Sequence, residues 1–205
     1  MKIAQRIIGP GHPCYIIAEM SANHGQDFDL AMQTIRAMKE AGADAVKVQT
    51  YTADSLTIAC DRAPFVVKGG TLWDGRTLHA LYQEGSMPWE WQPKLQAEAI
   101  ALGMDFFSTP FDDSAVDFLE AMQVPVHKIA SFEVVDIPLL RKVAATGKPV
   151  IMSTGMATLE EIEEAVSTLR QSGSGPIALL KCTSSYPAAP EEMNLRTIPD
   201  LALRF

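Results

Sequence analysis

Polar and charged side chains follow six short apolar runs of the chain, and several of them have the chemistry needed to hold a small anion. These residues are Glu19; Lys47 and Gln49; Ser108 and Thr109; Lys128, Ser131 and Glu133; Ser153 and Thr154; and Lys181, Thr183 and Tyr186. Lys47 and Lys128 can neutralise a carboxylate or a phosphate, and the hydroxyls can donate hydrogen bonds to the same group. Gly155 and the helix predicted behind Ser153 add backbone N–H groups. The alternative is that each lysine extends into solvent.

Glu19 and Glu133 are the candidate acid/base groups. Glu19 ends an otherwise apolar run, so we expect its carboxylate to face the site, a neighbouring lysine, or both. A carboxylate there can move a proton to or from a carbonyl or an attacking water. His24, in the loop after the first run, is the one histidine expected to approach a substrate. The four histidines show no convincing metal-ligand pair.

The six apolar runs are predicted to be parallel strands, because they are apolar on both faces and alternate with amphipathic helical patterns. The expected strands are residues 15–19, 44–49, 105–109, 126–133, 149–153 and 177–181. Helical spacing and helix-end signals predict helices over residues 28–41, 88–102, 115–122, 136–145 and 158–172, the last opening on a capping box at Thr158 and Glu161.

This order of elements favours an α/β fold of the (β/α)8 TIM-barrel type, in which the loops after all the strands converge on one site. An open doubly wound sheet is the alternative, but its site lies at a single crevice, whereas here every strand end is polar. About six βα units are present, and six strands alone would leave unpaired edges. Residues 1–205 are therefore predicted to be the N-terminal portion of a barrel domain in a longer protein, without the last two βα units.

Residues 50–87 interrupt the strand–helix repeat with a long segment rich in Asp, Gly and Thr. A long connection inside a compact domain is usually functional, so we predict a lid or specificity loop with a short helix at residues 78–84. The alternative is a packing excursion in which the tryptophans simply bury surface.

Composition excludes several classes of function. An apolar fraction of 47% supports a sizeable core, and 17 basic against 25 acidic residues give a net charge of −8. A nucleic-acid or polybasic membrane surface needs clustered lysines and arginines, which are missing. No signal peptide or spanning segment is expected, and we predict a cytoplasmic protein. Cys14, Cys60 and Cys182 are expected to be reduced thiols.

The sequence resembles the sialic acid synthase family through six motifs in order. They are IIAEMSANHG at 16–25, GADAVKVQTY at 42–51, FFSTPFD at 106–112, HKIASFE at 127–133, GKPVIMSTGMA at 147–157 and LLKCTSSYP at 179–187. Within the family, the segment LWDGRTLHALYQEGSMPWEW at 72–91 and the lysine at position 181 resemble the pseudaminic acid branch.

The resemblance implies a transferase that condenses phosphoenolpyruvate with an open-chain amino sugar, here 2,4-diacetamido-2,4,6-trideoxy-altrose, and releases phosphate. It implies that phosphoenolpyruvate is held by Lys47, Thr109, Lys128, Ser131 and Ser153, that Glu19 is the acid/base residue, and that Gln49, Glu133 and Tyr186 face the sugar or its attacking water. N-acetylneuraminate or legionaminate synthesis is the alternative activity, and a non-catalytic sugar-phosphate-binding barrel is the alternative from another class.

The same resemblance implies a divalent metal, Mn²⁺ or Mg²⁺, whose ligands lie downstream of residue 205. No metal ligand is therefore expected within this chain. It further implies a homodimer when the protein is full length.

Overall fold

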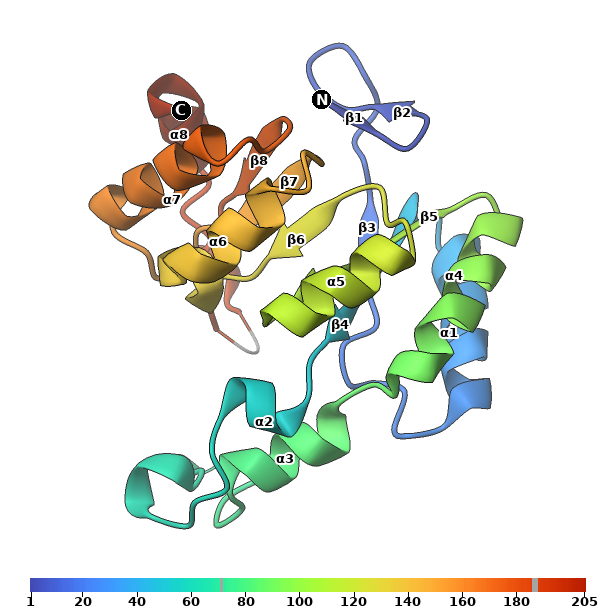
Figure 1. Ribbon diagram of the computed structural model, residues 1–205, viewed down its shortest axis with the longest axis vertical. Helices are drawn as coiled ribbons and strands as arrows, with labels where there is room; N and C mark the ends of the chain where they lie inside the picture. The colour runs from blue at the N-terminus through green and yellow to red at the C-terminus, as the bar shows by residue number, and fades with distance from the viewer. Residues whose placement is uncertain (71, 186–187) are drawn as a thin grey trace. The chain divides into compact units, whose positions relative to one another are not determined.

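The computed structural model describes residues 1–70, 72–185 and 188–205. The elements fall into two units along the chain (Figure 1). One unit comprises residues 14–123, and the other comprises residues 1–13 together with residues 124–205. Within the described ranges, no helix is long and apolar enough to cross a membrane.

The unit of residues 14–123 is built on a parallel sheet of β3 (Ile17–Glu19), β4 (Ala45–Thr50) and β5 (Asp105–Pro110). Helix α1 (Phe28–Glu40) joins β3 to β4, α4 (Gln92–Ala101) precedes β5, and α5 (Asp113–Ala121) follows it. Asp27 and Asp112 cap α1 and α5 by accepting hydrogen bonds from Leu30 N at 3.0 Å and Ala115 N at 2.7 Å. Side-chain caps therefore define where these two helices begin.

Helices α1 and α4 lie side by side and cover one face of this sheet (Figure 1). Val46, Val48 and Phe106 point to that face and share a buried cluster with Ile35 of α1 and Leu95 of α4. Successive side chains of a strand point to opposite faces. The remaining side chains of β4 and β5, including those of the predicted site, therefore point away from the helices.

The long insertion after β4 is ordered into short pieces. They are α2 (Ala53–Leu56), the 3₁₀ helix η1 (Ala63–Phe65), α3 (Leu78–Gly85) and the 3₁₀ helix η2 (Trp89–Trp91). Helices α2 and α3 lie against each other. The helix predicted at residues 78–84 is confirmed by α3. The helix predicted from residue 88 begins with η2 and becomes α-helical only at Gln92, because Pro88 is extended.

The second unit contains an antiparallel pair, β1 (Lys2–Ile3) with β2 (Arg6–Ile7), and a parallel sheet of β6 (His127–Ile129), β7 (Val150–Ser153) and β8 (Ile177–Leu180). Helices α6 (Ile137–Ala144) and α7 (Leu159–Gln171) alternate with these strands and pack on each other. The capping box predicted at Thr158 and Glu161 is confirmed, with bonds of 2.7 and 3.2 Å.

The strand predicted over residues 126–133 is wrong in its second half. Strand β6 ends at Ile129, and Ser131 is the N-cap of the 3₁₀ helix η3 (Phe132–Val135). The physical reason is a tight turn closed by a hydrogen bond of 3.2 Å from Glu133 N to Ala130 O. The first predicted strand, residues 15–19, is likewise shortened to β3.

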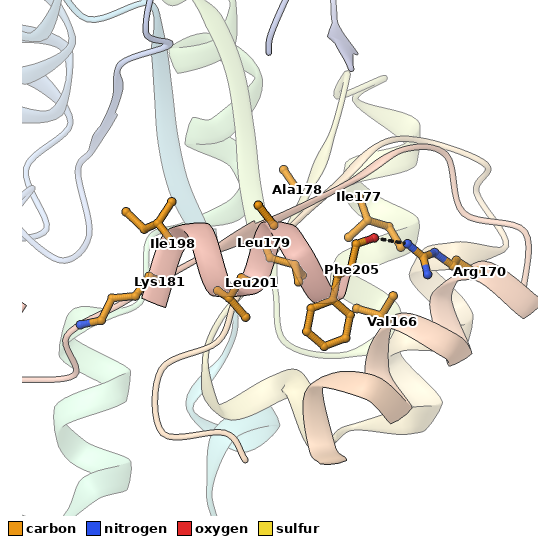
Figure 2. Close-up of a pocket in the computed structure, with 10 residues that line it drawn as sticks. Val166, Arg170, Ile177, Ala178, Leu179, Lys181, Ile198, Leu201 and Phe205 are labelled. Carbon is orange, nitrogen blue, oxygen red and sulfur yellow. Dashed lines mark hydrogen bonds between the residues drawn. The ribbon is translucent and has the colours of Figure 1, made fainter. Parts of the chain in front are cut away.

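The end of the chain forms η4 (Pro190–Glu192) and α8 (Thr197–Arg204), neither of which the sequence pattern predicted. Helix α8 lies against α7 and β8 and leaves an apolar cavity of about 290 Å³, lined by residues that include Val166, Leu179 and Leu201 (Figure 2). Arg170 Nη2 donates to Phe205 O at 2.9 Å and ties the two helices together.

Candidate active site

Glu19, the last residue of β3, forms an ion pair with Lys47, which lies within β4. The two residues are register partners in the parallel sheet, and Lys47 Nζ lies 2.5 Å from Glu19 Oε1. Lys47 is only 9% exposed, whereas the Glu19 side chain is 38% exposed. Removing an ammonium from water is costly unless a partner compensates it. Lys47 thus does not extend into solvent, and the predicted contact of Glu19 with a neighbouring lysine is confirmed.

Gln49 and Thr109 lie on the same face of the sheet as Lys47. They are register partners in β4 and β5, and Thr109 is buried. Ser108 points to the opposite, helix-covered face, because it is paired in register with Val48 of the core cluster. The structure therefore brings Lys47, Gln49 and Thr109 to one face and separates Ser108 from them.

Lys128 is the corresponding cation of the second unit. It is 5% exposed, and its Nζ donates to Ile129 O at 2.6 Å and to Ser153 Oγ at 2.5 Å. Ser153 ends β7 and shares a face with Lys128, because the register pairs Lys128 with Ile151. The structure thus joins these two predicted residues. The expectation that Lys128 and Lys47 belong to one binding site stays a prediction, because the two residues lie in different units.

Gly155 lies in a crowded turn beside this lysine and serine. A Cβ added at position 155 would lie 2.9 Å from Ser131 Oγ and 3.2 Å from Cys182 Cβ, and it would collide with Ser184 Oγ. A side chain at position 155 would require these two serine hydroxyls to rotate away. Two hydroxyls therefore approach the backbone directly after Ser153, where the sequence predicted N–H groups for an anion. Ser184, which lies in the last motif, was not among the predicted site residues.

Glu133 is a half-buried carboxyl in η3. Burial raises the pKa of Glu133, and the nearby charge of Asp136 raises it further. Its own backbone N–H and the charge of Lys128 act in the opposite direction. Oε2 of Glu133 is buried and has no hydrogen-bond partner in the described parts of the chain. A partly buried carboxyl with a raised pKa is a candidate acid/base group.

The raised pKa of Glu133 predicts a pH-dependent stability. The folded protein binds this proton more tightly than the unfolded chain, so stability falls as the pH rises through the folded-state pKa. We expect Glu133→Gln to raise the unfolding temperature at about pH 7, and to bring little gain at about pH 4, where both states are protonated. Thermal unfolding at the two pH values tests this. Glu164→Gln, at an exposed position of α7, is the control, and an equal gain at both pH values would contradict the prediction.

The remaining predicted residues have different surroundings. Lys181 follows β8, and its Nζ donates to Thr183 Oγ1 at 2.8 Å. Its ammonium points away from the apolar cavity beside α8 (Figure 2). Tyr186 lies outside the described residues.

His24 is not placed to approach a substrate, and that prediction is wrong. It is fully buried, its Nδ1 accepts from Gln26 N at 3.1 Å, and its ring packs edge-on against Trp91 at a centroid distance of 5.8 Å. Burial lowers the pKa of His24, with a weaker opposing effect from the backbone of Gly85. A neutral, packed imidazole is the result.

A metal site needs several His, Cys, Asp or Glu side chains close together. Among residues 1–70, 72–185 and 188–205, no three such side chains are grouped so that they could hold a metal ion. The divalent ion, whose ligands are expected downstream of residue 205, stays a prediction. No step of the chemistry below is assigned to a metal.

The repeated strand–helix units define a protein of the TIM-barrel class, as the sequence predicted. The chain belongs to the NeuB family, whose model matches residues 34–205. It is 46% identical over 189 residues to a pseudaminic acid synthase of Helicobacter pylori, covering 92% of this chain and 55% of that protein. It is 36% identical over 202 residues to an N,N'-diacetyllegionaminic acid synthase of Legionella pneumophila, covering 96% of this chain and 56% of that protein.

Solved structures agree with this assignment. The structure of an N-acetylneuraminic acid synthetase from Leptospira borgpetersenii in complex with citrate is similar with a TM-score of 0.83 and 30% identity, over 99% of this chain and 68% of that one. The chain spans about half the length of the curated relatives it matches. The predicted family is thereby confirmed.

Proposed function

We propose that the full-length protein is a synthase that condenses phosphoenolpyruvate with 2,4-diacetamido-2,4,6-trideoxy-altrose to form pseudaminic acid and phosphate. The observation that carries the proposal is the burial of two lysines, Lys47 and Lys128, which are 9% and 5% exposed and lie within strands β4 and β6 of an acidic protein. A buried ammonium is costly, so a fold keeps it where its charge is used. A phosphorylated carboxylate is a dianion or trianion that uses such charge well.

The chemistry requires both anion binding and proton transfer. In the proposed reaction the enol carbon of phosphoenolpyruvate attacks the sugar aldehyde, water adds to the neighbouring carbon, and cleavage of the carbon–oxygen bond releases phosphate. Lys128 and Ser153 already form a donor pair that can hold phosphate or carboxylate oxygens. Ser131 and the turn at Gly155 extend this cradle. Lys47 and Thr109 are assigned to the same ligand.

Glu19 is assigned as the acid/base residue. Its side chain is 38% exposed while its partner Lys47 is buried, so the carboxylate can exchange a proton with solvent or a bound substrate. Gaining or losing that proton changes the charge beside Lys47, which links proton transfer to anion binding. Gln49, Glu133, Lys181 and Tyr186 are assigned to the sugar and its attacking water.

Two sets of observations favour the pseudaminic activity over its alternatives. The pseudaminic acid synthases of Helicobacter pylori and Campylobacter jejuni are 46% and 44% identical to this chain, against 36% for the legionaminic acid synthase of Legionella pneumophila. The insertion that resembles the pseudaminic branch contains helix α3 and leads into α4, the helix that precedes β5. We assign sugar selection to that insertion and expect a homodimer.

The test is phosphate release by the full-length protein. It is incubated with phosphoenolpyruvate and, in separate reactions, the altrose derivative, N-acetylmannosamine and the legionaminic acid precursor. We expect the altrose derivative to give the highest kcat/KM. Preference for N-acetylmannosamine would overturn the pseudaminic assignment. Binding of phosphoenolpyruvate without turnover of any sugar would instead indicate a sugar-phosphate-binding barrel.

A further inference from the structure

Three buried polar side chains form a hydrogen-bonded chain on the helix-covered side of β4 and β5. Thr50 Oγ1 donates to Gln92 Oε1 at 2.9 Å and lies 2.6 Å from Ser108 Oγ. Thr50 ends β4, Ser108 lies within β5, and Gln92 begins α4; all three are fully buried. Polar groups are retained in a core only where hydrogen bonds offset their loss of water. The three residues therefore act as one unit.

Two arrangements of protons fit this hydrogen-bonded network. With Thr50 donating to Gln92 Oε1, the single proton of Thr50 is used and Ser108 donates to Thr50. Gln92 Nε2 is buried without a partner among the described residues, and a flipped amide would instead donate to Thr50, which would then donate to Ser108. In both arrangements the Ser108 hydroxyl is bonded to Thr50 and points away from the face that carries Lys47.

The chain lies directly behind the candidate site. Ser108 precedes Thr109 and Thr50 follows Gln49, and those two site residues are register partners. The same hydrogen-bonded network also joins the two ends of the insertion. Thr50 is bonded to Gln92, and next to this bond Trp89 Nε1 donates to Tyr51 O at 3.2 Å. One buried network thus fixes both the strand ends and the two ends of the insertion.

We propose that Ser108, Thr50 and Gln92 form a positioning relay that holds Gln49 and Thr109 in place from behind the sheet. Ser108 is then a positioning residue and not the substrate-binding residue that the sequence predicted. The roles of Gln49 and Thr109 rest on the proposed function, whereas the hydrogen-bonded relay itself does not. The test therefore separates the two.

The kinetic test uses two replacements of Thr50 in the full-length protein. Thr50→Val keeps the shape but removes the hydroxyl, leaving Gln92 and Ser108 without their common hydrogen-bond partner. We expect kcat to fall by about tenfold to a hundredfold, the effect of a small misplacement of binding groups. Thr50→Ser restores the hydroxyl and should return kcat to within about twofold of wild type. Wild-type kcat in Thr50→Val, or equal losses in both variants, overturns the relay.

Thr146→Val is the matched control. The Thr146 hydroxyl donates to Val143 O at 2.7 Å and accepts from Lys148 N at 3.2 Å, in the turn after α6 and outside the candidate site. Its removal should lower the unfolding temperature while leaving kcat unchanged. A fall in kcat as large as that of Thr50→Val would show that general destabilisation, and not positioning, causes the loss.

A double-mutant cycle separates the relay from direct substrate contact. If Ser108 acts only through Thr50, adding Ser108→Ala to Thr50→Val should cause no further loss of kcat or of thermal stability. Additive losses, or a larger rise in the KM for phosphoenolpyruvate in Ser108→Ala than in Thr50→Val, would overturn the proposal. If the wild type releases no phosphate with any sugar, the proposed function fails. In that case the relay is still tested by the unfolding temperatures of Thr50→Val, Ser108→Ala and the double variant. Additive losses of unfolding temperature would count against the relay.

Discussion

Glu19→Gln in the full-length protein is expected to lower kcat by about a hundredfold to ten-thousandfold, the usual contribution of a positioned acid/base group. Glutamine has nearly the shape of glutamate and can still accept a hydrogen bond from Lys47, but its amide cannot take up or release a proton in the reaction. Binding of phosphoenolpyruvate should persist, because Lys47 keeps its ammonium and loses the competing carboxylate 2.5 Å away. Steady-state kinetics and a direct binding measurement check both parts.

The control for Glu19→Gln is another carboxylate held in an ion pair. Glu98 Oε1 lies 2.7 Å from Arg36 Nε on the outer helices α4 and α1 of the same unit. Glu98→Gln removes a comparable pair and should leave kcat unchanged. A wild-type kcat in Glu19→Gln would rule out the acid/base role.

The order of strands and helices could be predicted from sequence because the local signals are strong and agree with one another. Asp27, Asp112 and Thr158 are helix caps with their bonds in place, and apolar runs mark β4, β5 and β7. Helix α8 was missed for a physical reason. It spans only eight residues, no side chain caps its start at Arg196, and Pro199 lies in its first turn but not at its first position, so the usual start signals are missing. Its apolar face is covered by α7 and β8, where Leu201 and Phe205 line a shared cavity.

The sequence indicated which charges lie inside buried strands, but it did not separate two adjacent polar residues onto the opposite faces of their strand. Lys47 and Lys128 stand out because a lysine inside a buried strand needs a reason. Ser108 and Thr109 were assigned to one site, although neighbouring residues of a strand point to opposite faces. Strict alternation from Lys47 and Gln49 would have selected Thr109 alone.

Gln92 shows the other limit of sequence-based prediction. Its partner Thr50 is 42 residues away, and the contact depends on where the insertion returns to the sheet. A glutamine at the start of a helix carries no pattern that indicates burial, since most glutamines are exposed. Glu133 is a similar case. Its burial arises from the turn that follows β6 at Ile129, whereas the sequence predicted one strand through residue 133.

Lys128→Ala in the full-length protein is expected to weaken phosphoenolpyruvate binding by about 1.5–3 kcal/mol, the range for a hydrogen bond to a charged group, or about tenfold to a hundredfold in Kd. Lys128 Nζ is buried and donates to Ser153 Oγ. Among the described contacts, Lys128 is the cation bonded to that hydroxyl. Lys128→Arg should also impair binding, because a planar guanidinium does not fit the space of a compact ammonium held by Ile129 O and Ser153 Oγ.

Titration calorimetry with phosphoenolpyruvate measures the change, and Lys39→Ala serves as the matched control, since Lys39 lies exposed in the last turn of α1. The control also accounts for the loss of one positive charge from an acidic protein, which alone weakens anion binding slightly and in a salt-dependent way. A buried donor is screened far less, so the defect of Lys128→Ala should persist at high salt while that of Lys39→Ala vanishes. Equal affinities of Lys128→Ala and wild type at high salt would remove Lys128 from the anion site and, with it, the main support for phosphoenolpyruvate as the ligand.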